Sequence, residues 1–313
     1  MASCRVTAIY RGAGGRDSIT SEVMADGSCT LIFFTMATIE PISAALVSLP
    51  PDATIGALLR HWRTVRRMSQ LQLALHAGIS SRHLSYLETG RARPSRDMVL
   101  HLADALEIPL RERNALLVAA GYAARFFETG LAAPELSQMR NAIDLILQHQ
   151  EPYPAFLLDR NWNIRMTNRA AERCTRFLLD ADPGEPNMIK LVARPDGLRP
   201  VLVNWEEIAG DLIRHLHNQI AATPSDAYAR DLLAEVLSYP GVPARWRARE
   251  IGVPSAPLLT THFRKGDVDL RFFSTITMFG TPHDVTLEEL RIESSFPADE
   301  ATRAWCDATL RSG

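Results

Sequence analysis

The sequence has few cysteines, two lysines and no long apolar run. Its four cysteines, at positions 4, 29, 174 and 306, never form a CxxC pair. Disulfide frameworks and zinc sites need clustered ligands, so neither is expected. His215 and His217 form an H-x-H, but on a helix their side chains would diverge by about 200°. We therefore expect no metal and no cofactor.

The apolar segments are too short for a membrane span, which needs about 18 or more such residues. The longest early run, LIFFTM at 31–36, follows Glu22 and Asp26, where a secretory signal would carry basic residues. We expect a cytoplasmic protein. The G-x-S-x-G, H-E-x-x-H and G-x-x-x-x-G-K-[ST] motifs are missing from the sequence, which argues against an enzyme.

Residues 1–51 show no sustained hydrophobic period and end in a Pro-Pro pair. We predict a disordered arm, or translation that truly starts at Met36. The glycines of Gly12–Gly15 are no phosphate-binding loop, because no convincing strand precedes them and no helix follows.

Arginine is unevenly distributed in a chain whose net charge is −2. Between Arg60 and Arg96 there are eight arginines and one acid, Glu88, whereas residues 122–313 carry a net charge of −5. A single cationic block predicts a local surface for a polyanion. The alternative is an ordinary solvated helix face.

From residue 52 the pattern changes to short helices separated by glycine and proline. The apolar residues of 55–65 recur at i, i+3, i+4, i+7 and i+10, which predicts one buried stripe. Ser69 and Gln72 form a capping box for a second helix, and Ser80 is the N-cap of a third over Ser81–Thr89. A fourth follows Ser95, and a fifth covers Leu110–Ala120.

The second and third of these helices carry a constrained spacing. A small residue is needed where the two helices cross, a glycine where the turn needs a positive φ, and apolar residues in the wedge between them. The residues in these positions are Gln70, Ala74, Gly78, Ile79, Leu84 and Leu87. This pattern, over about 65 residues, resembles the lambda-repressor/Cro type of helix-turn-helix in the xenobiotic-response-element family.

The exposed face of the third helix is the candidate DNA-recognition surface. Arginine suits guanine O6 and N7, serine is permissive, and Gln70 is expected to bond a phosphate at its helix N-terminus. The candidate DNA-contacting residues are Gln70, Ser80, Ser81, Arg82, His83, Ser85, Tyr86, Arg91 and Arg93. The resemblance to phage repressors also implies an internal ion pair between Arg63 and Glu88.

The second half reads as an α+β domain. A helix over Pro134–Gln150 bridges to it, and two strands are expected at Ala155–Asp159 and Asn163–Met166. Helices follow at about 168–179, 204–222 and 225–239. Strands at Leu258–Arg264, Val268–Thr277 and Glu289–Ser295, then a helix over Ala298–Leu310, close the chain.

Longer stretches are similar to one family, the MmyB-like regulators. The likeness is carried by RHLSYLETGRARPSR (82–96), PLRERNALLVAAGY (109–122), HQEPYPAFLLDRNWNI (149–164), RPDGLRPVLVNWEE (194–207), RFFSTITMFGTPHDVTLEEL (271–290) and ESSFPADEAT (293–302). The resemblance implies a PAS-like ligand-binding domain after the DNA-binding domain, and a fatty-acid-like small molecule. One departure is Arg194, where the family has histidine, which leaves the ligand preference open.

A PAS-like sheet would fold over a helical layer and enclose a pocket. The candidate lining residues are Phe156, Leu158, Trp162, Trp205, Leu212, Phe263, Phe272 and Ile276. Each of them is also an ordinary core residue by its pattern. As a group they favour an apolar or amphipathic ligand.

We therefore predict a multidomain protein. An all-α five-helix DNA-binding domain over 52–122 and a linker helix at 123–150 precede a PAS-like α+β domain over 151–313, with an antiparallel sheet of about five strands. The function is a homodimeric, ligand-modulated transcriptional regulator that binds double-stranded DNA. The alternatives are a protein-interaction adaptor, and a constitutive DNA binder whose second domain holds no ligand.

Overall fold

The computed structural model describes residues 53–179, 184, 186–223, 226–249, 259–280 and 282–309. The predictions for residues 1–51 lie outside this part of the chain.

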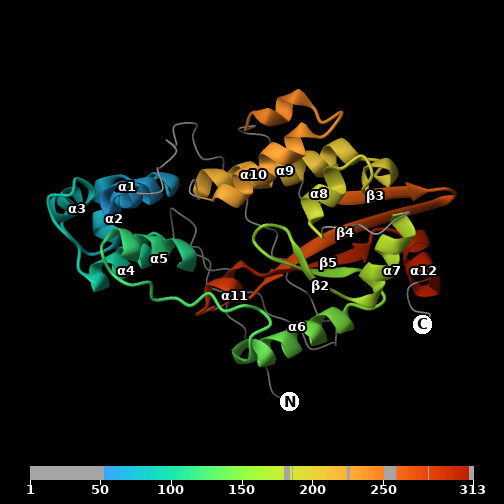
Figure 1. Cartoon of the computed structure of the whole chain (residues 1–313), viewed down its shortest axis with the longest axis horizontal. Coiled ribbons are helices and arrows are strands. Elements are labelled where there is room, and N and C mark those ends of the chain that lie inside the picture. The colour runs from blue at the N-terminus through green and yellow to red at the C-terminus, as the bar shows by residue number, and fades with distance from the viewer. Residues whose placement is uncertain are drawn as a thin grey trace, which may run out of the picture. The chain divides into compact units, whose positions relative to one another are not determined.

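The N-terminal domain is a set of short helices in the predicted order (Figure 1). They are α1 (Ile55–Val65), α2 (Gln70–His76), α3 (Ser81–Glu88), α4 (Arg96–Ala105) and α5 (Leu110–Ala119). The expected capping box is present, because Ser69 accepts from the Gln72 N–H while the Gln72 side chain accepts from the Ser69 N–H. Ser80 caps α3 by accepting from the His83 N–H at 3.1 Å.

Close packing of α2 and α3 follows from the residues between them. Gly78 has φ of +63°, as the tight turn requires. Leu73, Leu84 and Leu87 are all 0% exposed, and Ala74 is 1% exposed. The predicted apolar wedge therefore forms the core of this domain.

A segment without regular structure leads from α5 to the C-terminal domain. It ends in a short 3-10 helix, η1 (Pro134–Leu136), and in α6 (Ser137–His149). The predicted bridging helix over Pro134–Gln150 agrees with these two elements, whereas residues 123–133 of the predicted linker helix are not helical.

A five-stranded antiparallel sheet, in the order β2-β1-β5-β4-β3, is the centre of the C-terminal domain. Its strands are β1 (Ala155–Leu158), β2 (Ile164–Thr167), β3 (Thr260–Lys265), β4 (Val268–Met278) and β5 (Arg291–Pro297). β1 and β5 are neighbours although about 130 residues separate them, which sequence order alone does not reveal.

The two faces of the sheet have different covers (Figure 1). Ala155, Leu157 and Ile292 pack against α6 on one face. The opposite face, called the inner face below, packs Leu158, Phe263, Leu270 and Phe272 against a helical layer. The helices and 3-10 helices of this domain are α7 (Arg169–Leu178), α8 (Met188–Ala193), η2 (Arg199–Val201), α9 (Trp205–Ala222), α10 (Ala227–Ser238), η3 (Ala244–Arg247), α11 (Val285–Glu289) and α12 (Glu300–Thr309).

The last strand begins later than predicted. Glu289 was expected to begin the last strand, but it ends α11, and β5 starts at Arg291. Asp284 is the cause, because its side chain accepts from the Thr286 N–H and starts a helical turn. No helix in the described ranges is both long and apolar enough to cross a bilayer.

Candidate nucleic-acid interface and C-terminal interior

The outer face of α3 is polar and open. Ser81 and Arg82 are exposed, while His83, Ser85 and Tyr86 are half-buried. The Arg82 Nε donates to the Tyr86 hydroxyl at 3.0 Å, and its guanidinium lies 5.4 Å from the centre of the Tyr86 ring. This contact orients an arginine that would otherwise be flexible. The face thus offers one preorganised cation between small hydroxyl side chains.

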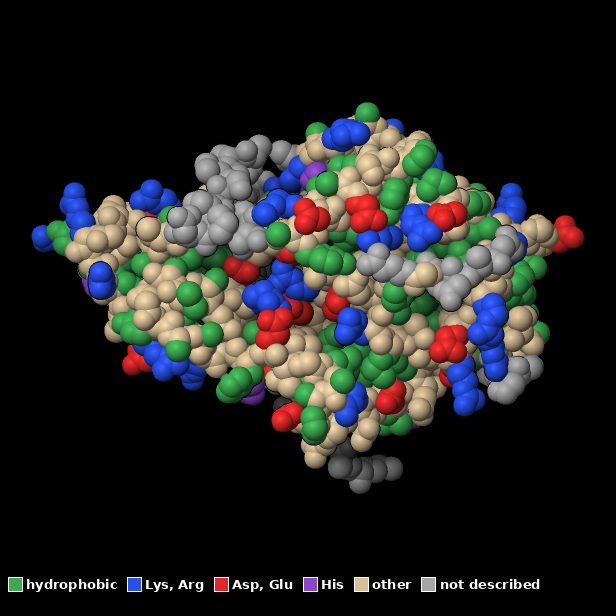
Figure 2. Space-filling model, viewed as in Figure 1, with side chains coloured by type: hydrophobic (Ala, Val, Ile, Leu, Met, Phe, Trp, Pro, Cys, Tyr) green, Lys and Arg blue, Asp and Glu red, His purple; other side chains and the backbone are tan. Residues whose placement is uncertain are grey.

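Two further arginines follow α3. Arg91 and Arg93 are exposed, and the Arg91 guanidinium lies 6.0 Å from the Tyr86 ring centre. Figure 2 shows several Lys and Arg side chains and few acidic ones over the part of the view occupied by α1–α4. The cationic block of the sequence is therefore a surface feature of this domain.

Beneath this surface lies a charged network centred on Glu88. The Glu88 side chain is fully buried and accepts from Arg63 Nε at 2.7 Å and from Arg63 Nη2 at 3.0 Å. Burial alone would raise the pKa of Glu88, but the hydrogen bonds from Arg63 and Gln70 hold it below its ordinary value. The structure thus brings Arg63 and Glu88 together as a pair.

Gln70, the predicted phosphate contact, also takes part in this internal network. Its side-chain amide nitrogen donates to Glu88 Oε2 at 2.8 Å. One of its two amide hydrogens therefore helps to satisfy the buried carboxylate.

The predicted lining residues of the C-terminal domain lie mostly in one cluster. Seven of the eight pack together in the core over the inner face; Leu158, Trp162 and Phe272 are buried, while Phe156, Trp205, Leu212 and Phe263 are half-buried. Ile276 is half-buried on β4, outside that cluster.

Two charged residues of this face, Arg291 and Glu293, were not among the predicted lining residues. Their partners across the sheet are Leu158 and Phe156, so all four side chains project from the inner face. Burial lowers the pKa of Arg291 to about 10 and raises the pKa of Glu293. A signal existed: the alternation R-I-E in a predicted strand puts both charges on one face.

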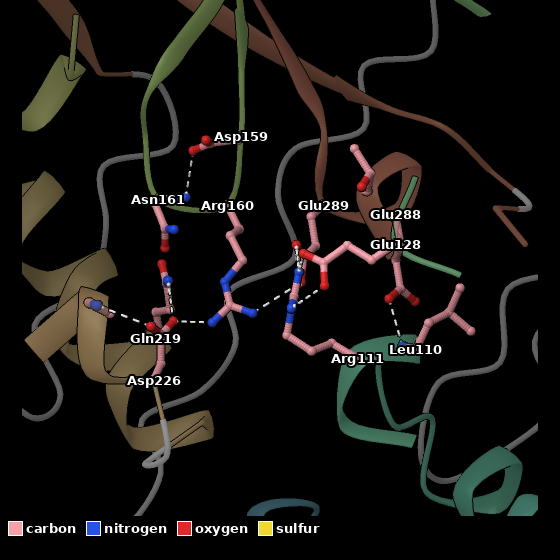
Figure 3. Close-up of polar contacts among 12 residues, drawn as sticks. Leu110, Arg111, Glu128, Asp159, Arg160, Asn161, Gln219, Asp226, Glu288 and Glu289 are labelled. Carbon is pink, nitrogen blue, oxygen red and sulfur yellow. Dashed lines mark hydrogen bonds and ion pairs between the residues drawn. The ribbon is translucent and has the colours of Figure 1, made fainter. Parts of the chain in front are cut away.

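Polar contacts join the helical domain to the C-terminal domain (Figure 3). Arg111 on α5 donates to Glu289 through Nε at 2.7 Å and Nη2 at 2.9 Å, and to Glu128 through Nη1 at 2.9 Å. The hydrogen bond to Glu289 is the main reason that the pKa of Arg111 is raised. Arg160 lies between Glu289, at 3.0 Å, and Asp226. We call these five residues the junction network.

Two backbone contacts reinforce the junction. The Leu110 N–H donates to Glu288 Oε2 at 2.6 Å, and His61 Nε2 lies 3.1 Å from the carbonyl oxygen of Ala222. A crevice of about 400 Å³ opens beside the junction network and is also lined by Glu112 and Asn161. Burial raises the pKa of Glu112.

Comparisons with known proteins agree with this architecture. Residues 139–308 match the family model described as the MmyB-like transcription regulator ligand binding domain, and residues 54–116 match a helix-turn-helix domain model. The chain is 32% identical over 120 residues to an HTH-type transcriptional regulator of Mycobacterium tuberculosis strain CDC 1551 / Oshkosh, and equally to one of strain ATCC 25618 / H37Rv. Each alignment covers 38% of this chain and 78% of the relative.

Among solved structures, the chain shows a weak likeness to an RNA-binding light-oxygen-voltage receptor. The sequence identity is 14% and the TM-score 0.24, over 82% of this chain and 61% of that chain. A likeness of this size carries no argument about function. The two family matches, together with the helix-turn-helix and the five-stranded sheet, establish that the chain belongs to the MmyB-like transcription regulators, with a helix-turn-helix domain followed by a ligand-binding domain.

Proposed function

We propose that this regulator binds specific DNA sequences through α3, and that an apolar or amphipathic small molecule in its C-terminal domain modulates that binding. The observation that carries the proposal is the outer face of α3, where Arg82 is held against Tyr86 between the exposed Ser81 and the half-buried Ser85. A helix of this kind fits the major groove, and an arginine there can bond both guanine O6 and N7.

The remaining predicted contacts divide between bases and backbone. Ser85 and Tyr86 lie on the same helix face as Arg82 and are assigned to base edges. Ser80 and Ser81 lie at the N-terminus of α3, where free N–H groups favour a phosphate. Arg91 and Arg93 are assigned to the backbone. Gln70 keeps its second amide N–H, its amide oxygen and its backbone N–H for DNA.

Modulation by a ligand requires that it bind two arrangements of the domains with different affinity. The junction network supports such coupling. Glu289 is the last residue of α11, directly before β5, and alternate side chains of β5 project from the inner face. A ligand that shifts β5 also shifts the carboxylate that holds Arg111 of α5. We propose further that the protein is a homodimer, which places two α3 helices about one turn of DNA apart.

The test starts with genome-wide mapping of bound DNA, which supplies a specific site. The affinity of wild-type protein for that site and for random DNA is then measured across a salt series. Several phosphate contacts predict a steep loss of affinity as salt rises. Arg82→Ala is expected to weaken specific binding by about 1–3 kcal/mol and to change random-DNA binding much less.

Arg303→Ala is the matched control, because Arg303 is an exposed arginine of α12, outside the DNA-binding domain. It should leave both affinities unchanged. Equal losses on both DNAs for Arg82→Ala would mean that this arginine contacts phosphate only. A protein with no salt-dependent DNA binding would instead be an adaptor, and one whose affinity never responds to small molecules would be a constitutive binder.

A further inference from the structure

The inner face of the sheet is mostly apolar, and Arg291 and Glu293 form a polar row on it. Arg291 and Glu293 are two positions apart on β5, so their Cα atoms lie about 6.6 Å apart on the same face. Glu293 lies opposite Phe156 on one side and Ile276 on the other. Charged groups in such a place are costly unless their hydrogen-bonding capacity is met.

Arg291 is only partly satisfied. Its Nη2 donates to the carbonyl oxygens of Asp159, at 3.2 Å, and Arg160, at 2.8 Å. Its guanidinium lies 4.1 Å from the centre of the Trp162 ring. Nothing in the described ranges accepts a hydrogen bond from its Nε or Nη1. Two groups of donors therefore remain for something else.

Glu293 is in a similar position. Its carboxylate bonds the Ser274 hydroxyl, and the charge of Arg291 lowers its pKa, but no ion pair between the two is found among the described residues. Ser274 in turn lies 3.4 Å from the hydroxyl of Ser295. A carboxylate has about four acceptor positions, so one serine leaves most of them unused.

Both side chains keep accessible surface although they project toward a covered face. Arg291 and Glu293 are half-buried rather than buried, as are their neighbours Phe156 and Ile276. On the same face, Leu158 and Phe272 are fully packed. The partly accessible residues are thus adjacent to one another on this face.

We infer that Arg291 and Glu293 together bind the polar head group of the ligand, and that this head group carries a hydrogen-bond acceptor and a donor on neighbouring atoms, as a carboxamide or an un-ionised carboxylic acid does. The acceptor takes a hydrogen bond from Arg291 Nε or Nη1, and the donor gives one to Glu293. The inference rests on the proposed ligand-modulated function and deepens it.

The surroundings determine the rest of the ligand. Phe156 and Ile276 flank the polar row, so the part of the molecule next to the head group must be apolar. Burial raises the pKa of Glu293, although the hydrogen bond with Ser274 and the charge of Arg291 act in the opposite direction. Arg291 also holds the β1–β2 turn that carries Arg160, which links the head group to the junction network.

The experiment compares two probes with the same chain, dodecanamide and N,N-dimethyldodecanamide, by equilibrium dialysis against the full chain. Both have the carbonyl acceptor, but only the primary amide has a donor. Wild-type protein should bind the primary amide about tenfold or more tightly, the effect of one hydrogen bond to a charged group.

The variants separate the two contacts. Glu293→Leu should reduce primary-amide affinity about tenfold and leave dimethyl-amide affinity nearly unchanged, whereas Arg291→Lys should weaken both amides alike. If Glu293→Leu fails to fold, Glu293→Gln takes its place in the test. This variant keeps the size of the side chain and should lose part of the discrimination between the two amides. Ile292→Val, on the same strand and the opposite face, is the control and should leave the discrimination intact.

Equal binding of the two amides by wild-type protein, no binding of either, or discrimination that survives Glu293→Leu or Glu293→Gln would overturn the inference. DNA affinity is measured on the same samples. If DNA binding persists while the amides fail, the head-group site is wrong and the regulator stands; if DNA binding is missing, the proposed function itself has failed.

Discussion

At the scale of single residues, the DNA-binding domain depends on one buried carboxylate. Glu88 is reached by Arg63, by Gln70 and, at 3.7 Å, by Arg60. Removing a partner from a buried pair costs more than the pair contributes, because a desolvated charge is left behind. Arg63 is 14% exposed, so its charge would be left mostly without water.

Glu88→Gln is therefore expected to lower the free energy of unfolding at pH 7 by about 3 kcal/mol. The folded pKa of Glu88 lies below its ordinary value of 4.5, so its stabilisation is complete above that pH and is lost as pH falls through the folded pKa. Urea unfolding between pH 3 and pH 7 would show it: the variant should lose less stability on acidification than the wild type. Parallel curves would contradict this account.

At the scale of elements, the spacing between α1 and α3 is set by a glycine. A Cβ built on Gly56 would lie 2.6 Å from the carbonyl oxygen of Glu88 and 2.7 Å from that of Leu87. Backbone atoms cannot turn away as a flexible side chain can. The end of α3 therefore rests directly on the first turn of α1, and the recognition helix is held by this contact.

Gly56→Ala tests this packing. Alanine would favour an isolated helix by up to about 1 kcal/mol, whereas the clash costs about 1–3 kcal/mol or more. The clash should dominate, so the melting temperature should fall, as measured by circular dichroism. Gly130→Ala, where a Cβ meets nothing within 4 Å, should leave it nearly unchanged. An unchanged or raised melting temperature for Gly56→Ala would show that α1 and α3 can separate freely.

At the scale of the whole molecule, the junction network decides whether the two domains respond to each other. Glu289 accepts from two arginines, Arg111 of α5 and Arg160 of the β1–β2 turn. Glu128 contributes to Arg111 from a more exposed position. Loss of the Glu289 carboxylate would therefore remove the hydrogen bonds to both arginines. Loss of the Glu128 carboxylate would remove only a contact with Arg111.

Glu289→Gln is expected to remove about 1–3 kcal/mol of coupling between the domains. Calorimetry should then resolve separate unfolding of the helical and C-terminal domains, and the ligand response of DNA affinity should shrink. Glu128→Gln, whose side chain is 57% exposed, should have a smaller effect on both measurements. Identical unfolding of wild type and Glu289→Gln would mean that the junction transmits nothing.

Much of the fold was predictable from local patterns. The capping box at Ser69, the φ of Gly78 and the buried leucines of α3 follow from short-range rules, so the helix-turn-helix could be placed by sequence alone. The order of strands and helices in the C-terminal domain was predictable for the same reason. α8 and α11 were not predicted because they are short. Asp284 caps the N-terminus of α11, so Glu289 lies in a helix instead of the predicted strand.

What the sequence determined by itself is therefore the set of elements and the outward residues of α3, since helix period, caps and turn glycines act within a few residues. The tertiary structure decided which distant residues meet: Gln70 with Glu88, Arg111 with Glu289, and Glu293 with Phe156 and Ile276 on the covered face of the sheet. Those contacts depend on strand order and on the packing of the elements. A buried charge is costly without a partner, but local sequence patterns do not show which distant residue that partner is.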